Sequence, residues 1–305
     1  MHDFAVQEPT RTTSGTAVDS RPQWNIDARS IVFQRTTLTG SALHLLHLYG
    51  DLSGQTDMLE LCNEAGKTVQ GRVAFFARDK FAFVGDRAGR PAIWLADLTR
   101  RLVEPLTQPA ADEADHGPTA LPTTDGHFSF FRIIGSGRPH LFVGRVGESV
   151  QPLTINRDFG DQPWFLPGTN RLVFHSRRSG GQRVFEQEVR HGAAARQISD
   201  QDEITPYVMP FPSPDGAHIA FASAVSGESQ IWVMRTDGSN RQQLTFGPMA
   251  ACFPAWAPSS DEIVFVRGEP QAATPTGALW KLSLCRHDAA SLRQRRAALS
   301  NALSE

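Results

Sequence analysis

The stretch FPSPDGAHIAFASAVSGESQIWVMRTDGSNRQQLT, from Phe211 to Thr245, decides the fold of this chain. Its first turn, Ser213–Gly216, combines a proline that fixes φ with a glycine that supplies a positive φ, and leads into the apolar strand Ile219–Phe221. A second turn leads to the strand Ile231–Met234, and Asp237–Gly238 then turns the chain into a third strand. Short strands joined by tight turns predict an antiparallel β-sheet.

The same unit recurs along the chain. An anchor of the form apolar-x-Phe occurs six times, with successive starts 50, 47, 44, 47 and 44 residues apart, and a second apolar strand starts 12 to 16 residues after each anchor. The anchors start at Ile31, Phe81, Phe128, Leu172, Ile219 and Ile263. A period of about 45 residues with about four short strands per unit is typical of a propeller. The sequence therefore predicts an all-β fold, a six-bladed β-propeller of four-stranded antiparallel blades.

The two ends of the chain are expected to meet in the last blade. The sixth unit has no outer strand of its own after Leu279–Leu284, whereas Val6–Thr10 resembles the outer strand Val103–Thr107 of the second unit. Thr10 precedes the first anchor by 21 residues, the same interval that separates Thr107 from the third anchor. We therefore predict that the N-terminal residues 2–10 complete the last blade, close the ring and remove its open edges.

The propeller so defined spans residues 1–286, and the remaining residues, 287–305, predict a short C-terminal helix. Asp288 is a suitable N-cap, and Leu292, Leu299 and Leu303 fall on one stripe of such a helix. The helix either packs on the outside of the propeller or binds a partner.

Composition narrows the classes of partner. Lys and Arg total 30 against 32 Asp and Glu, so no overall charge favours nucleic acid or an anionic membrane. The N-terminus has no secretory signal pattern, and no run of about eighteen apolar residues occurs. Three cysteines far apart in the sequence do not suggest a disulfide framework. We expect a cytoplasmic protein.

The Phe211–Thr245 unit closely resembles the TolB-type (WD40-like) propeller repeat, W-S-P-D-G-x-x-I-A-F … I-Y-V-M-x-x-D-G-x-x-x-x-x-L-T. Pro212 stands where that repeat has tryptophan, while Trp24, Phe165 and Trp256 keep an aromatic residue at this place in other units. The resemblance implies the propeller fold but little about function, because its motifs are turn and packing residues. The sequence shows neither the export signal nor the α/β domain of the periplasmic TolB protein, so we expect a stand-alone propeller.

The resemblance implies that ligands meet the loop face, which carries the loops between blades and the loops between second and third strands. Arginine stands two places after the anchor Phe at Arg35, Arg132 and Arg267. If these side chains reach the channel mouth, their guanidinium forks would bind carboxylate or phosphate. Alternatively, each pairs with a neighbouring acidic loop, such as Asp112–Asp115 or Asp158–Asp161.

Other loop residues complete the set of candidates. Arg177, Trp164 and Phe253 are candidate ligand-binding residues on the same face. His116, His175 and Tyr207 are the candidate acid–base residues, since imidazole titrates near neutrality, although each could instead be structural. No acidic loop follows an EF-hand spacing, so we expect neither a metal nor a cofactor.

Two functions remain open from the sequence. The first is a propeller that binds a protein, a peptide or a small anionic ligand at its loop face. The second is a small-molecule enzyme of the lyase, isomerase or cyclase class, with its active site at the channel mouth.

Overall fold

The computed structural model describes residues 3–15, 17–64, 67, 69–121, 126–135, 137–154, 159–199, 206–268 and 277–286. The predicted C-terminal helix (287–305) lies outside these residues. All the regular secondary structure of the described residues consists of β-strands. These residues include no helix long and apolar enough to cross a membrane.

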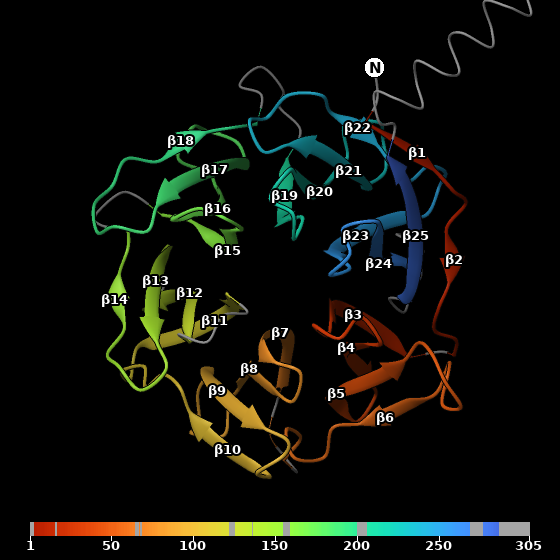
Figure 1. Ribbon diagram of the computed structural model, residues 1–305. Helices are drawn as coiled ribbons and strands as arrows, with labels where there is room; N and C mark the ends of the chain where they lie inside the picture. Colours follow the sequence, from red (N-terminus) through yellow and green to blue (C-terminus); the bar gives the residue numbers. More distant parts are fainter. Residues whose placement is uncertain are drawn as a thin grey trace, which may run out of the picture.

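Six antiparallel sheets are arranged in a ring (Figure 1), and several cavities lie along the central channel of this ring. The innermost strands are β3 (Val18–Trp24), β7 (Val69–Ala77), β11 (Glu113–Ala120), β15 (Asp161–Leu166), β19 (Tyr207–Pro212) and β23 (Ala250–Trp256). The second strands are β4 (Ser30–Thr37), β8 (Lys80–Gly85), β12 (His127–Ile134), β16 (Arg171–Ser176), β20 (His218–Ser223) and β24 (Glu262–Gly268). The third strands are β5 (Gly40–His47), β9 (Ala92–Asp97), β13 (Pro139–Arg145), β17 (Arg183–Glu188), β21 (Gln230–Arg235) and β25 (Ala278–Arg286). The outer strands are β6 (Thr56–Met58), β10 (Leu102–Pro105), β14 (Gln151–Pro152), β18 (Arg196–Gln197) and β22 (Gln242–Gln243).

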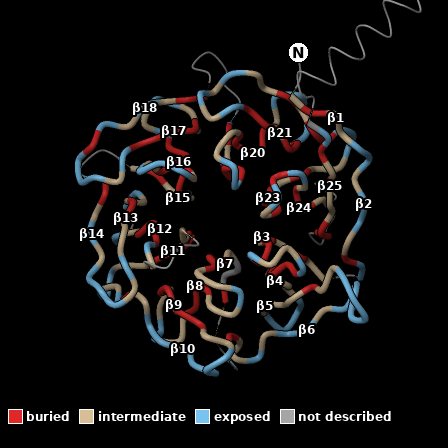
Figure 2. Tube along the Cα trace, in the orientation of Figure 1, coloured by how far each residue is buried: buried red, intermediate tan, exposed pale blue. Residues whose placement is uncertain are grey.

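This arrangement confirms the predicted six-bladed, all-β propeller with four-stranded antiparallel blades. Both apolar residues of every anchor are completely buried, as Ile31 and Phe33 are in the first blade and Ile219 and Phe221 in the fifth. Burial is concentrated within and between the blades, and exposure on the outer strands and turns (Figure 2). The anchors are therefore core residues, packed because both faces of each sheet are covered.

A side-chain hydrogen bond explains the polar residue that ends the repeat. In the fifth blade the Ile231 backbone N–H donates to Oγ1 of Thr245, at 2.9 Å. Thr107, Thr154 and Ser199 accept the corresponding N–H in the second, third and fourth blades. The hydroxyl thereby satisfies a buried backbone donor on the third strand.

The N-terminal segment lies against the sixth blade. The strands β1 (Phe4–Val6) and β2 (Thr10–Arg11) both pair antiparallel with β25, and lie beside it in Figure 1. Oγ1 of Thr13 accepts the Leu279 N–H at 2.9 Å, so Thr13, not Thr10, occupies the position of Thr107. The sequence comparison aligns Thr10 with Thr107. The structure places Thr13 there, three positions later, because the N-terminal segment pairs with β25 as two separate strands.

All six innermost strands contain a β-bulge, seen as a register shift against the second strand. Bulges re-aim side chains and break the alternation of a strand. These six bulges face the channel and determine what lines it.

Candidate functional site

The bulges share a local sequence and an unusual backbone conformation. In five blades a residue with positive φ is followed by proline, at Arg21-Pro22, Gly117-Pro118, Gln162-Pro163, Met209-Pro210 and Phe253-Pro254. Four of the five positive-φ residues are not glycine, with φ between 52° and 55°. Such a conformation costs of order 1 kcal/mol for a non-glycine residue and clusters at functional sites. Here it directs large side chains into the channel.

The second blade departs from this pattern, because Arg72 occupies the position that is proline in the other five blades. Its guanidinium reaches past the third blade to β15. Nη1 donates to Oε1 of Gln162 at 2.8 Å, and Nη2 donates to the carbonyl oxygens of Gly117 and Pro163 at 2.9 and 3.1 Å. The guanidinium also lies 4.5 Å from the centre of the Trp164 ring. Arg72 therefore reaches into the channel from β7.

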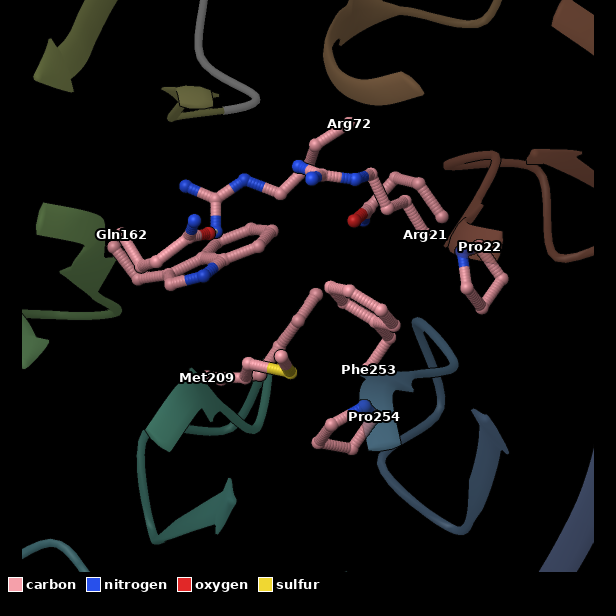
Figure 3. A pocket seen from close by; sticks show the side chains of 10 residues that line it. Arg21, Pro22, Arg72, Gln162, Met209, Phe253 and Pro254 are labelled. Carbon is pink, nitrogen blue, oxygen red and sulfur yellow. The ribbon is translucent and has the colours of Figure 1, made fainter. Parts of the chain in front are cut away.

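Arg21 lies next to Arg72 in the channel (Figure 3). Its guanidinium stands 5.3 Å from the centre of the Phe253 ring. Neither Arg21 nor Arg72 forms a salt bridge with any residue that the structure describes, and the buried Nε of Arg72 has no hydrogen-bond partner among them. We call Arg21 and Arg72 the channel arginines.

The electrostatics of the channel follow from this lack of salt bridges. Burial, and secondarily the neighbouring charge of Arg21, lowers the pKa of Arg72 to about 9, although the charge of Asp161 opposes this shift. Burial also lowers the pKa of Arg21 below its usual range. Both side chains stay protonated at neutral pH, so two positive charges share a poorly solvated space. Such a space favours an anion that would take the place of the missing carboxylates.

The arginines predicted from the sequence are engaged elsewhere. Arg35 pairs with Asp19 through two bonds of 2.7 and 2.9 Å. Arg132 pairs in the same way with Asp115, at 2.6 and 2.9 Å, and with Glu113 at 2.9 Å. The alternative prediction, pairing with a neighbouring acidic loop, therefore holds for Arg132. Asp158, in the second acidic loop, lies outside the described residues.

The other two predicted arginines lie apart from the channel arginines. Arg267 donates from Nη2 to the carbonyl oxygen of Phe246 and lies 5.4 Å from the Trp280 ring centre. Arg177 lines a cavity of about 590 Å³ between the third and fourth blades, together with Arg138, Arg178 and His175. We call this cavity the loop-face cavity.

The three acid–base candidates do not lie together in the structure. Nδ1 of His175 accepts the Met209 N–H at 3.3 Å, and Nε2 pairs with Asp161, so both ring nitrogens are occupied. Tyr207 is buried against Phe221, with its hydroxyl bonded to Arg241. His175 thus fixes the position of Met209, and Tyr207 packs between the fifth blade and its neighbours.

His116 is the acid–base candidate that lies beside the channel arginines. It lines a cavity of about 160 Å³ together with Arg21, Arg72 and Gln162, and its ring stacks on Phe131 at a centroid distance of 5.5 Å. Burial lowers its pKa, the charge of Asp115 opposes this effect, and the charge of Arg21 adds to it. Trp164 and Phe253, both predicted as ligand contacts, lie under Arg72 and Arg21.

Sequence reasoning missed the channel arginines, Gln162 and Met209. A signal existed, because Arg21, Gln162, Met209 and Phe253 each precede a proline and each stand ten residues before an anchor. Arg72 stands out only when the blades are aligned on those prolines, because it occupies the proline position in the second blade. Among the described residues, no group of three His, Cys, Asp or Glu side chains gathers in a way that could hold a metal ion.

Comparison with known proteins agrees with the fold. Residues 135–278 match the TolB beta propeller domain. An uncharacterized protein of Agrobacterium fabrum is 44% identical over 54 residues, a stretch that spans 18% of this chain and 18% of that protein. The chain is thus a six-bladed propeller, and residues 135–278 are similar to the TolB beta propeller domain.

Solved structures extend the similarity to almost the whole chain. A protein assigned as TolB from Agrobacterium tumefaciens superimposes with a TM-score of 0.66 and 17% identity, over 89% of this chain and 91% of its own. A gluconolactonase from Xanthomonas campestris superimposes with a TM-score of 0.64 and 16% identity, over 90% of this chain and 88% of its own. At such identities the likeness concerns the fold alone, and the second of these two neighbours is an enzyme.

Proposed function

We propose that this protein is a TolB-like propeller that binds a small anionic ligand in its central channel. The observation that carries the proposal is the pair of channel arginines, two guanidiniums in a poorly solvated channel without a carboxylate partner among the described residues. A carboxylate or phosphate would accept hydrogen bonds from both forks and offset their repulsion. Gln162 supports the site because its Oε1 holds the Arg72 fork in place.

Isothermal titration calorimetry with benzoate and with inorganic phosphate tests the proposal. We expect at least one of these anions to bind, and the double variant Arg21→Gln/Arg72→Gln to lose that binding. Arg138→Gln is the matched control, because Arg138 lines the loop-face cavity away from the channel arginines. Failure of both anions to bind, or equal binding to the double variant, would contradict the proposal.

The alternative is an enzyme whose substrate or product is such an anion, and His116 is the observation that favours it. Its lowered pKa keeps the imidazole neutral at pH 7, which suits a general base beside an arginine-bound substrate. The gluconolactonase neighbour suggests lactone hydrolysis as a first assay. If the native protein turns the substrate over, and His116→Gln loses this turnover but still binds the anion, the protein is an enzyme. If the native protein binds the anion without turnover, the binding propeller is favoured.

A third possibility is that the propeller binds a protein or a peptide at its loop face. It is supported by the loop-face cavity, where Arg138, Arg177 and Arg178 gather. Weaker capture of an acidic peptide library by Arg177→Gln than by the native protein would assign this cavity to a partner. Equal capture would leave the channel as the binding site.

We also propose that the N-terminal segment closes the ring. The pairing of β1 and β2 with β25 supports this. So do the two hydrogen bonds of 2.8 Å that Arg235 donates to the Asp3 carboxylate, and the two that the Phe4 backbone and the Gln242 side chain exchange. Deletion of residues 2–13 should lower the melting temperature strongly if the segment acts as the closing strand, and leave it unchanged if it only lies on the surface.

A further inference from the structure

The channel contains three cavities in series. The chamber beside His116, of about 160 Å³, and a neck of about 20 Å³ share Arg21, Arg72 and Gln162 in their walls. The neck in turn shares Gln23, Trp164 and Phe211 with a third cavity of about 460 Å³. We call this third cavity the apolar basin. The charged and apolar parts of the channel therefore meet at the neck (Figure 3).

The apolar basin differs sharply from the arginine side in chemistry. Its walls are aromatic rings, prolines and aliphatic side chains, and Gln23 is the only polar side chain among the described residues that line it. The large rings are Trp24, Phe75, Trp164, Phe165, Phe211 and Trp256. Its volume falls within the range of about 300–1,000 Å³ that is typical of small-molecule sites. A cavity of this kind suits an apolar group and disfavours a sugar or a polyanion.

The basin opens at the end of the channel opposite the loop face. Its rim includes residues of the turns that join first to second strands, namely Ile26, Pro167, Gly168, Pro214 and Pro258. The chamber, in contrast, includes Val84 and Ile133, near the ends of second strands that lead to the loop face. An apolar ligand would therefore enter from the face that the sequence did not single out.

From these contacts we infer that the ligand is a carboxylic acid with an apolar body, held with its carboxylate in the neck and its body in the basin. This inference rests on the proposed anion-binding function. The neck has room for a group not much larger than one water molecule, which needs about 10–15 Å³, so a carboxylate fits better than a sugar ring. Arg21 and Arg72 both line the neck and would receive that carboxylate.

Trp164 explains why head and body would be recognised together. Its ring forms part of the basin wall, while the Arg72 guanidinium lies 4.5 Å from the ring centre. An apolar body packed on the ring places an attached carboxylate beside the guanidinium. The same ring therefore links the hydrophobic contact to the ion pair.

The test is calorimetric titration with three matched probes: octanoate, acetate, which lacks the apolar body, and octanol, which lacks the carboxylate. We expect octanoate to bind at least tenfold more tightly than either of the others. Arg72→Gln should weaken octanoate by about 10- to 100-fold, the usual effect of losing a charge-assisted hydrogen bond.

A second variant tests the basin separately. Ile26→Asp places a negative charge at the basin rim and should weaken octanoate at least tenfold. Leu38→Asp is the matched control, because Leu38 is fully exposed on the turn between β4 and β5 and should leave octanoate binding unchanged. Melting curves of all variants check that each is folded.

The outcomes separate the inference from the proposed function. Equal binding of acetate and octanoate, both lost in Arg72→Gln, would overturn the apolar body and leave the anion site standing. Octanoate binding that Arg72→Gln and Arg21→Gln leave unchanged would overturn both, and so would the absence of binding by acetate and octanoate alike.

Discussion

Two pairs of arginines in this propeller have opposite environments. Arg35 and Arg132 lie on second strands, and each donates two hydrogen bonds to a single carboxylate. Arg21 and Arg72 stand on the innermost strands, in the bulges, and form no salt bridge with the described residues. The first pair fills repeat positions and holds strands together. In the second pair, Arg21 occupies the variable position before the bulge proline, and Arg72 replaces that proline. The comparison indicates that a binding site in this fold is best sought where the repeat varies.

The largest loss of stability is expected at the ion pair of Arg132. Asp115 is completely buried and holds the Arg132 guanidinium. Asp115→Asn would leave that buried charge with the more exposed Glu113 as its carboxylate partner, and should lower the free energy of unfolding by up to about 3–5 kcal/mol. Urea unfolding followed by circular dichroism measures this. A loss below about 1 kcal/mol would show that the pair is not structural.

The Asp3–Arg235 contact offers a second paired site, of intermediate effect. The hydrogen bonds from Arg235 hold the pKa of Asp3 well below its ordinary 3.8. A lowered carboxyl pKa stabilises the fold above the ordinary value, and this stabilisation is lost as the pH falls below it. Asp3→Asn should therefore reduce the melting temperature at pH 7 and have progressively less effect below pH 3.8. A difference that is the same at every pH would contradict the ion pair.

Arg21→Gln should change stability much less, which sharpens the comparison. Arg21 has no salt bridge among the described residues, and its charge opposes that of Arg72. We expect the free energy of unfolding to change by no more than about 1 kcal/mol, because no ion pair is lost and the repulsion between Arg21 and Arg72 is relieved. Urea unfolding measures this beside Asp115→Asn. Destabilisation as large as that of Asp115→Asn would mean that Arg21 is a structural residue.

The smallest effect concerns the titration of His116. Burial and the charge of Arg21 lower the pKa of this imidazole below 6.5. In Arg21→Gln burial still lowers the pKa and the charge of Asp115 still raises it, so the loss of the Arg21 charge should raise the pKa. NMR titration of the His116 ring protons follows this shift, with Arg35→Gln as the control. An unchanged or lower pKa in Arg21→Gln would place His116 outside the influence of the channel arginines.

The sequence predicted the scaffold well because the scaffold repeats. The anchors Ile31 to Phe33 and Ile219 to Phe221, and the terminal hydroxyl of Thr245, are copied from blade to blade, and each copy restates the same packing or hydrogen bond. The N-terminal register was less predictable, since a break between β1 and β2 moved the equivalent residue from Thr10 to Thr13.

The candidate site was predictable only in part. Trp164, Phe253 and His116 were selected as loop residues and do lie at the channel. The channel arginines could not be identified in this way, because both lie in bulges and Arg21 has a positive φ, features that the apolar anchors do not reveal. The partners of Arg35 and Arg132 depend on cross-strand register, which fixes which carboxylate lies opposite each arginine.

The most direct measurement is a crystal structure of the protein with 4-iodobenzoate, located by the anomalous signal of its iodine. The account predicts one strong peak in the apolar basin, near Trp24 and Trp256, with the carboxylate in the neck between Arg21 and Arg72. A peak in the loop-face cavity beside Arg138 and Arg177, with the channel empty, would contradict the claim that the channel arginines form the binding site.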